Sequence, residues 1–277
     1  MVCASGSLTG TTAGPLPDVF RTDLGPDRRM RNHWRVTSST WAPSRWRRGL
    51  AALMPVAVPL AMESVFTRAV RQFGPQRGYQ VGFAVYWVTC WAAAGAIAGP
   101  RRLAALWQPA AEPLPSPHRL AWSVLAAPAV GAVATQWLPH ARRSGPAAVV
   151  VATGVGITNA LAEEALWRGL PVVVFPHDRV RGWLWPAAGF TAWHLVPLTV
   201  RQTSPRTRVG ILLGASAIGL GYGWIAQQTS SLAVVAPAHA LTDSCGVRSP
   251  HLWRPPPRQP TSRCQPSPST PTPQPRS

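Results

Sequence analysis

The chain has 277 residues, of which 46% are apolar and 13% are charged, and its net charge is +18. Soluble globular proteins usually carry about 25% charged residues, so this composition argues against a soluble domain. All the basic residues are arginines, and they flank long apolar runs instead of forming one continuous stripe. That distribution is typical of loops at a membrane surface, and we therefore expect no nucleic-acid partner.

Residues 1–48 form the first segment, which is polar and basic and rich in Thr, Ser, Pro and Gly. It lacks the apolar core of a signal peptide. Its eight arginines favour a cytoplasmic location. We predict a basic, disordered N-terminal extension.

Residues 49–243 form the predicted membrane-embedded domain. Spanning the hydrocarbon core takes about 20 predominantly apolar residues. Runs with at most one charge lie at 49–67, 78–100, 120–141, 144–162, 182–200 and 209–242. The last run is long enough for two spans, with a polar break at 227–231. The predicted fold class is all-α, a polytopic membrane helix bundle of about seven to eight transmembrane helices. We expect it to be a multi-pass protein of the plasma membrane, in contact with the lipid bilayer.

Residues 244–277 form a third segment, which is basic and rich in proline. Such a composition cannot pack a core, so we predict a disordered tail. The four cysteines of the chain contain no CxxC pair. The sequence therefore supports neither a disulfide framework nor a cysteine-based zinc site.

Besides Glu63, four charged residues lie within or at the edge of apolar runs: Glu163, Glu164, Arg168 and Asp243. Each charge placed in mid-bilayer costs about 2.5–3.5 kcal/mol on insertion scales, so we expect all four to face the interior of the bundle. Glu164 and Arg168 are four residues apart, with the acid first, which favours an ion pair within the helix. Glu163 then points about 100° away, without a partner in its own helix, and is available for chemistry.

Two histidines are also embedded in apolar segments. His194 follows Phe190 by four residues, and His239 precedes Asp243 by four, so each pair shares one helix face. Each segment alone is more typical of a structural hydrogen bond, or of an ion pair that joins two helices, than of a catalytic site. The occurrence of three such segments in one chain favours a shared site, whereas Glu63 has no such context and is assigned a structural role.

The three segments resemble the signature of a known family of intramembrane proteases. Their motifs are Glu163-Glu164-x-x-x-Arg168, Phe190-x-x-x-His194 and His239-x-x-x-Asp243. In this order they resemble the CAAX prenyl protease and bacteriocin-processing family (CPBP), over roughly residues 145–243. The resemblance implies about eight helices around an internal cavity and the hydrolysis of a peptide bond in a membrane-associated substrate.

The resemblance also implies a role for each ionisable residue. Glu163 and His194 would hold and deprotonate the attacking water, and Glu164 with Arg168 would brace the site. His239 and Asp243 would stabilise the oxyanion of the tetrahedral intermediate. Members of the family have Asn or Asp at the position of Asp243. Because an aspartate donates a hydrogen bond only when it is protonated, Asp243 has the alternative role of orienting His239.

We predict that the protein needs no cofactor. The alternative is a zinc ion held by Glu163, His194 and His239 with one open coordination position. The expected partner is a peptide or protein substrate in the membrane. The principal alternative to an endopeptidase is a non-catalytic immunity or scaffold protein of the same fold. A transporter or proton relay is a third possibility, but it has no need for the Glu-Glu-x-x-x-Arg spacing.

Overall fold

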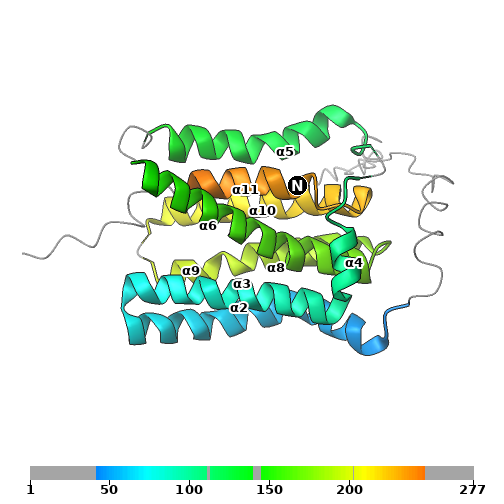
Figure 1. Ribbon diagram of the computed structural model, residues 1–277, viewed down its shortest axis with the longest axis horizontal. Coiled ribbons are helices and arrows are strands. Elements are labelled where there is room, and N and C mark those ends of the chain that lie inside the picture. Colours follow the sequence, from blue (N-terminus) through cyan, green and yellow to red (C-terminus); the bar gives the residue numbers. More distant parts are fainter. Residues whose placement is uncertain (1–41, 111–112, 140–144, 202, 247–277) are drawn as a thin grey trace, which may run out of the picture. The chain divides into compact units, whose positions relative to one another are not determined.

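The computed structural model describes residues 42–110, 113–139, 145–201 and 203–246. Every regular element in these ranges is a helix (Figure 1). The predicted disorder of the N-terminal extension and of the tail falls mainly on residues outside these ranges. The first helix, α2 (Arg45–Phe73), begins within the predicted extension, and the last, α11 (Val235–Gly246), ends just beyond the predicted membrane domain.

The helices α2 and α3 (Pro75–Ala98) form a tight hairpin. Gly74 joins them with a φ of 79°, a conformation that side chains other than glycine's rarely allow. A Cβ added at Gly78 would lie 2.4 Å from Val70 Cα, so the two backbones nearly touch at this end. One turn further on, the ring of Phe66 packs against Gly82. This hairpin holds one face of α3 toward the rest of the bundle.

The middle of the chain contains a succession of helical elements. They are α4 (Pro100–Ala105), α5 (His118–Ala132) with its π-helical extension η2 (Val133–Trp137), α6 (Pro146–Glu164), the π-helical turn η4 (Ala165–Gly169) and α7 (Leu170–Val174). Because α6, η4 and α7 follow one another without a break, they form one helical rod. The sequence predicted a regular helix here, and the π-helical turn directly after Glu164 was not anticipated.

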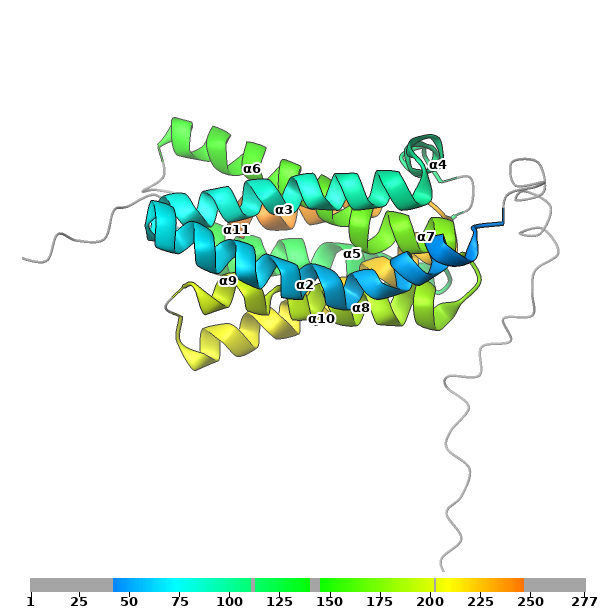
Figure 2. The same cartoon turned by 90° about the horizontal axis from the view of Figure 1, so that it is seen from below.

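The remaining elements are η5 (Val180–Leu184), α8 (Trp185–Trp193), α9 (Leu195–Thr199) and α10 (Pro205–Thr229), followed by α11. The predicted polar break is confirmed, because α10 ends at Thr229 and Ser230 has a φ of 51°. Figure 2 shows α2 lying against α8, and α11 packs mainly against α6. A Cβ added at Gly156 of α6 would lie 2.5 Å from Ser244 N. The absence of a side chain at Gly156 therefore lets α6 and α11 approach closely.

Five helical segments of the described residues are long and apolar enough to cross a membrane. They are Arg45–Phe73, Pro75–Ala98, His118–Trp137, Pro146–Val174 and Pro205–Thr229. Large apolar side chains are exposed on their outer faces, for example Val88, Val150 and Leu213, each more than 60% accessible. Such faces suit lipid and not water. The all-α, polytopic helix-bundle class is therefore confirmed.

The number of long spans is smaller than the predicted seven to eight. The run 182–200 is divided among η5, α8 and α9, with a break at His194. The final helix α11 has only 12 residues. The difference thus arises where two of the three motifs lie, because the helices that carry the histidines are short.

Candidate active site

The acidic motif lies at the end of α6, and its side chains are buried. Relative exposure is 1% for Glu163, 0% for Glu164 and 2% for Arg168. His239, on α11, is 1% exposed. The close packing of α6 against α11 brings this histidine to the acidic motif. The prediction that these charged groups face the bundle interior is therefore confirmed.

Glu164 is held from two sides. Arg168 Nη1 lies 3.1 Å from Glu164 Oε1, which confirms the predicted ion pair, although this nitrogen makes no aligned hydrogen bond. His239 Nδ1 lies 2.7 Å from the same oxygen. The guanidinium also donates from Nη2 to Ile218 O at 3.2 Å and stacks 4.2 Å above the Phe190 ring. These contacts fix Arg168 and, through it, Glu164.

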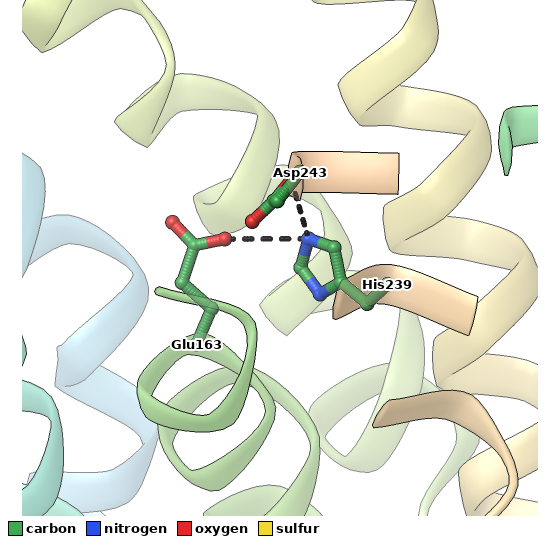
Figure 3. A group of neighbouring side chains, drawn as sticks. All are labelled: Glu163, His239 and Asp243. Atoms are coloured by element: carbon green, nitrogen blue, oxygen red, sulfur yellow. Dashed lines mark ion pairs between the residues drawn. The ribbon is translucent and has the colours of Figure 1, made fainter. Parts of the chain in front are cut away.

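The orientation of His239 follows from its contact with Glu164. A carboxylate oxygen at 2.7 Å accepts a hydrogen bond, so Nδ1 carries a proton. Nε2 then points toward Glu163 Oε2 at 3.5 Å and Asp243 Oδ1 at 3.6 Å (Figure 3). Glu164 therefore orients His239 through Nδ1, and the orienting role of Asp243 stays a prediction.

Glu163 has one oxygen fixed and one oxygen turned into the site. Its Oε1 accepts hydrogen bonds from Tyr86 OH at 3.1 Å and from Trp193 Nε1 at 2.9 Å. The Tyr86 hydroxyl in turn accepts from Trp167 Nε1 at 2.8 Å. Oε2 is buried and has no hydrogen-bond partner among the described residues; it faces His239. One oxygen thus anchors the carboxylate while the other is presented to His239.

His194 lies at the junction between α8 and α9. Its Nδ1 is 2.8 Å from Phe190 O, and since a carbonyl only accepts, Nδ1 carries the proton and Nε2 has the free lone pair. The Phe190 ring contacts both histidines, with its centroid 4.7 Å from the His194 ring and 5.9 Å from the His239 ring. The second motif therefore contacts the site through the ring of Phe190, which touches His239.

The side chains of Glu163, His239 and Asp243 are placed such that they could hold a metal ion. Among the described residues, these three form the only group whose carboxylate and imidazole atoms all lie within 4.8 Å of one another. The sequence-based zinc alternative had His194 in place of Asp243. Two carboxylates and one imidazole are a donor set that zinc accepts. Metal-free hydrolysis thus stays a prediction. In the zinc alternative, Asp243 replaces His194 as the third ligand.

Several polar partners were missed by sequence reasoning. Tyr86, Trp167 and Trp193 are hydrogen-bonded into the site, and so are Trp87 and Asn159, described below. Aromatic residues are common throughout membrane helices, so nothing in the sequence marked Tyr86 or the tryptophans as residues of the site. Asn159 gave a weak one, because it is the amide residue within the uncharged run 144–162 and precedes Glu163 by one helical turn.

Comparison with protein families identifies this part of the chain. The family described as type II CAAX prenyl endopeptidase, Rce1-like, matches residues 145–245. Neither the curated proteins nor the solved structures contain a match to the chain. The matched segment begins just before α6 and ends within α11, so it contains all three motifs but not α2 or α3. Residues 145–245 therefore match the Rce1-like family of CAAX prenyl endopeptidases, the family that the three motifs indicated.

Proposed function

We propose that the protein is an integral-membrane endopeptidase of the plasma membrane that hydrolyses a peptide bond of a membrane-associated, CAAX-type substrate. The observation that carries this proposal is the arrangement of Glu163. One oxygen of its carboxylate is fixed by two donors, and the other faces His239 Nε2 at 3.5 Å. A general base needs a fixed orientation and a free lone pair, and Glu163 has both.

In the proposed reaction, Glu163 Oε2 accepts a proton from water as the water oxygen attacks the scissile carbonyl. A carbon–oxygen bond forms, and the carbonyl oxygen becomes an oxyanion. The proton on Glu163 then passes to the amide nitrogen as the carbon–nitrogen bond breaks. The products are a carboxylic acid and an amine, and Glu163 regains its original state.

His239 is placed to stabilise the oxyanion through Nε2. Because Nδ1 already donates to Glu164, Nε2 donates only when the imidazole is positively charged. Three carboxylates, those of Glu163, Glu164 and Asp243, surround His239, against one guanidinium, that of Arg168. This excess of negative charge favours the imidazolium. Donors aimed at a developing oxyanion in a site without bulk water act strongly.

His194 is the second group for the attacking water. Since its Nδ1 is engaged by Phe190 O, only Nε2 is available to accept a hydrogen bond from water. Glu164 and Arg168 brace the site and do not react in this scheme.

An apolar cavity of about 490 Å³ lies between α3, α4 and α6. Its lining includes Trp91, Leu103, Trp107 and Leu161. An apolar lining of this kind suits the hydrocarbon chain of a prenylated substrate. We therefore expect a prenylated peptide to be cleaved more efficiently than the same peptide without its prenyl group.

The test is cleavage of a fluorogenic farnesylated CAAX peptide by the purified full-length protein in detergent. Glu163→Gln should lower kcat at least about 100-fold, as expected for loss of a general base. Glu63→Gln is the matched control, because Glu63 is an exposed glutamate of an apolar helix, and it should leave kcat unchanged. Equal cleavage by the two variants, or none by the unsubstituted protein, would favour the immunity or scaffold alternative.

Two further arms address the chemistry. If no metal takes part, a zinc chelator should leave the rate unchanged. Inhibition by the chelator that is reversed by added zinc would assign the reaction to a metal ion. His194→Ala should lower kcat if this histidine holds the water.

A further inference from the structure

A second hydrogen-bonded chain reaches the site from α3 and ends on Asp243. Trp87 Nε1 donates to Asn159 Oδ1 at 2.8 Å. Asn159 Nδ2 donates to Asp243 Oδ2 at 2.7 Å. The three residues come from α3, α6 and α11, and all three are partly buried. This series of hydrogen bonds thus links three helices that are far apart in the sequence.

The direction of this chain is fixed by the chemistry of its first member. An indole N–H only donates, so the atom of Asn159 that faces Trp87 is the amide oxygen. The amide NH₂ group must then face Asp243, where it meets an acceptor. Trp87 therefore determines which end of the Asn159 amide is presented to the carboxylate.

The consequence for Asp243 is a defined orientation. Its Oδ2 accepts from Asn159, and its Oδ1 lies 3.6 Å from His239 Nε2. Among the described residues, Asn159 donates a hydrogen bond to this carboxylate. The Asp243 side chain is 20% exposed. A partly exposed aspartate without such a donor has other rotamers open to it. The amide therefore keeps Oδ1 turned toward the imidazole.

Asn159 and Glu163 are four residues apart on α6, so they share one face of the helix. That face carries both the proposed base and the group that orients Asp243. Tyr86 and Trp87 are neighbours on α3, and each ends on a different carboxylate, Tyr86 on Glu163 and Trp87 through Asn159 on Asp243. The helix α3 lies outside the segment that matches the family.

We propose that Asn159, oriented by Trp87, is a positioning residue that sets the geometry of Asp243 beside His239. The proposal rests on the proposed hydrolytic function. It implies that residues of α3 complete the site and that the matched segment 145–245 does not suffice for full activity. Neither Asn159 nor Trp87 touches the reacting atoms in this scheme, so both act through Asp243.

The first test compares the kinetics of single and double variants of the full-length protein. Asn159→Asp removes the donor and places two carboxylates side by side. It should lower kcat about 10- to 100-fold, as expected for a lost hydrogen bond to a charged group, with KM nearly unchanged. The double variant N159D/D243N exchanges the two groups and restores every hydrogen bond of the chain. It should recover most of the lost kcat, which a merely structural defect would not allow.

Trp87→Phe tests the orientation of the amide without changing Asn159. It should lower kcat by several-fold, because the amide is then free to turn its oxygen toward Asp243. Trp183→Phe is the matched control, since Trp183 Nε1 also donates a hydrogen bond, at 2.7 Å to Leu220 O, but outside the site. Its kcat should equal that of the unsubstituted protein.

A spectroscopic measurement provides a readout that does not require activity. With ¹⁵N-labelled tryptophan, the indole resonance of Trp87 is identified by its loss in Trp87→Phe. It should shift in Asn159→Ala and stay in place in Thr158→Ala, a substitution at the neighbouring exposed position. An unshifted resonance in Asn159→Ala would overturn the hydrogen-bonded chain itself.

The outcomes separate the two proposals. An unsubstituted protein that cleaves, together with Asn159 variants of unchanged kcat, would overturn the positioning role alone. An equal loss of kcat in N159D and in N159D/D243N would also overturn it. Failure of the unsubstituted protein to cleave any CAAX peptide would overturn the hydrolytic function and the positioning role with it. The indole resonance would still report whether the hydrogen bonds from Trp87 through Asn159 to Asp243 exist.

Discussion

The buried ion pair at the centre of the site leads to a quantitative prediction for stability. Replacing Arg168 by methionine removes the guanidinium but keeps much of its apolar volume. Glu164 then loses the ion pair at 3.1 Å and retains only His239 as a charged partner. Removing one partner of a buried pair costs about 3–5 kcal/mol, because the remaining charge is left uncompensated.

This cost converts into a change of unfolding temperature. For proteins of about 150–250 residues, 1 kcal/mol corresponds to about 2–4 °C, so Arg168→Met should lower Tm by about 6–20 °C. The assay is thermal unfolding of the purified protein in detergent, followed by circular dichroism. Arg168→Met/Glu164→Gln, which also neutralises the acid, should recover a large part of the loss.

A matched arginine lies outside the site. Arg181 pairs with Asp178 at 2.7 Å, and these side chains are 57% and 29% exposed. Exposed pairs contribute about 0.2–1 kcal/mol, so Arg181→Met should lower Tm by no more than about 4 °C. Equal effects of Arg181→Met and Arg168→Met would refute the reasoning, because they would show that burial adds nothing to the cost of breaking the pair.

Three further predictions concern other parts of the structure. Tyr86→Phe removes a donor to Glu163 and should lower kcat about 10-fold or more, as expected for a hydrogen bond to a charged group, measured with the farnesylated peptide. Gly156→Leu places a side chain where Ser244 N lies 2.5 Å from a Cβ; it should separate α6 from α11 and abolish cleavage, whereas Gly154→Leu, which has open space, should not. The backbone N–H of Arg181 donates to Asp178 and lowers the pKa of its carboxyl. The stability that Asp178 contributes is therefore present above its unfolded-state pKa and lost as the pH falls through its folded-state pKa. A series of Tm values against pH should show this acid loss, and Asp178→Ala should reduce it.

The convergence of the charged motifs was predictable from the sequence because burial forces it. Glu163, Glu164 and Arg168 lie in an apolar segment, where a charge that faced lipid would be costly. Four-residue spacing on a helix then indicated which acid Arg168 would pair with. Both inferences use only local geometry and the polarity of the surroundings, and the structure agrees with both.

The contacts that cross between distant helices were not predictable in the same way. Tyr86 precedes Glu163 by 77 positions, and no spacing rule relates them. The orientation of His239 depended on which of three nearby carboxylates reached Nδ1, and that is set by the packing of α11 on α6. The break at His194 was also hidden, because the apolar run 182–200 reads as one continuous span.

The hairpin of α2 and α3 has a consequence for how the protein enters the membrane. Chains are made from the N-terminus, so Tyr86 and Trp87 leave the ribosome before Glu163, Asn159 and Asp243 do. When the acidic helix reaches the bilayer, the hydrogen-bond donors that receive it are already in place. Deleting the hairpin should therefore reduce the integration of residues 146–174 during translation, which glycosylation mapping of the nascent chain would detect. We therefore expect α2 and α3 to assist the membrane insertion of the helix that carries the charged residues.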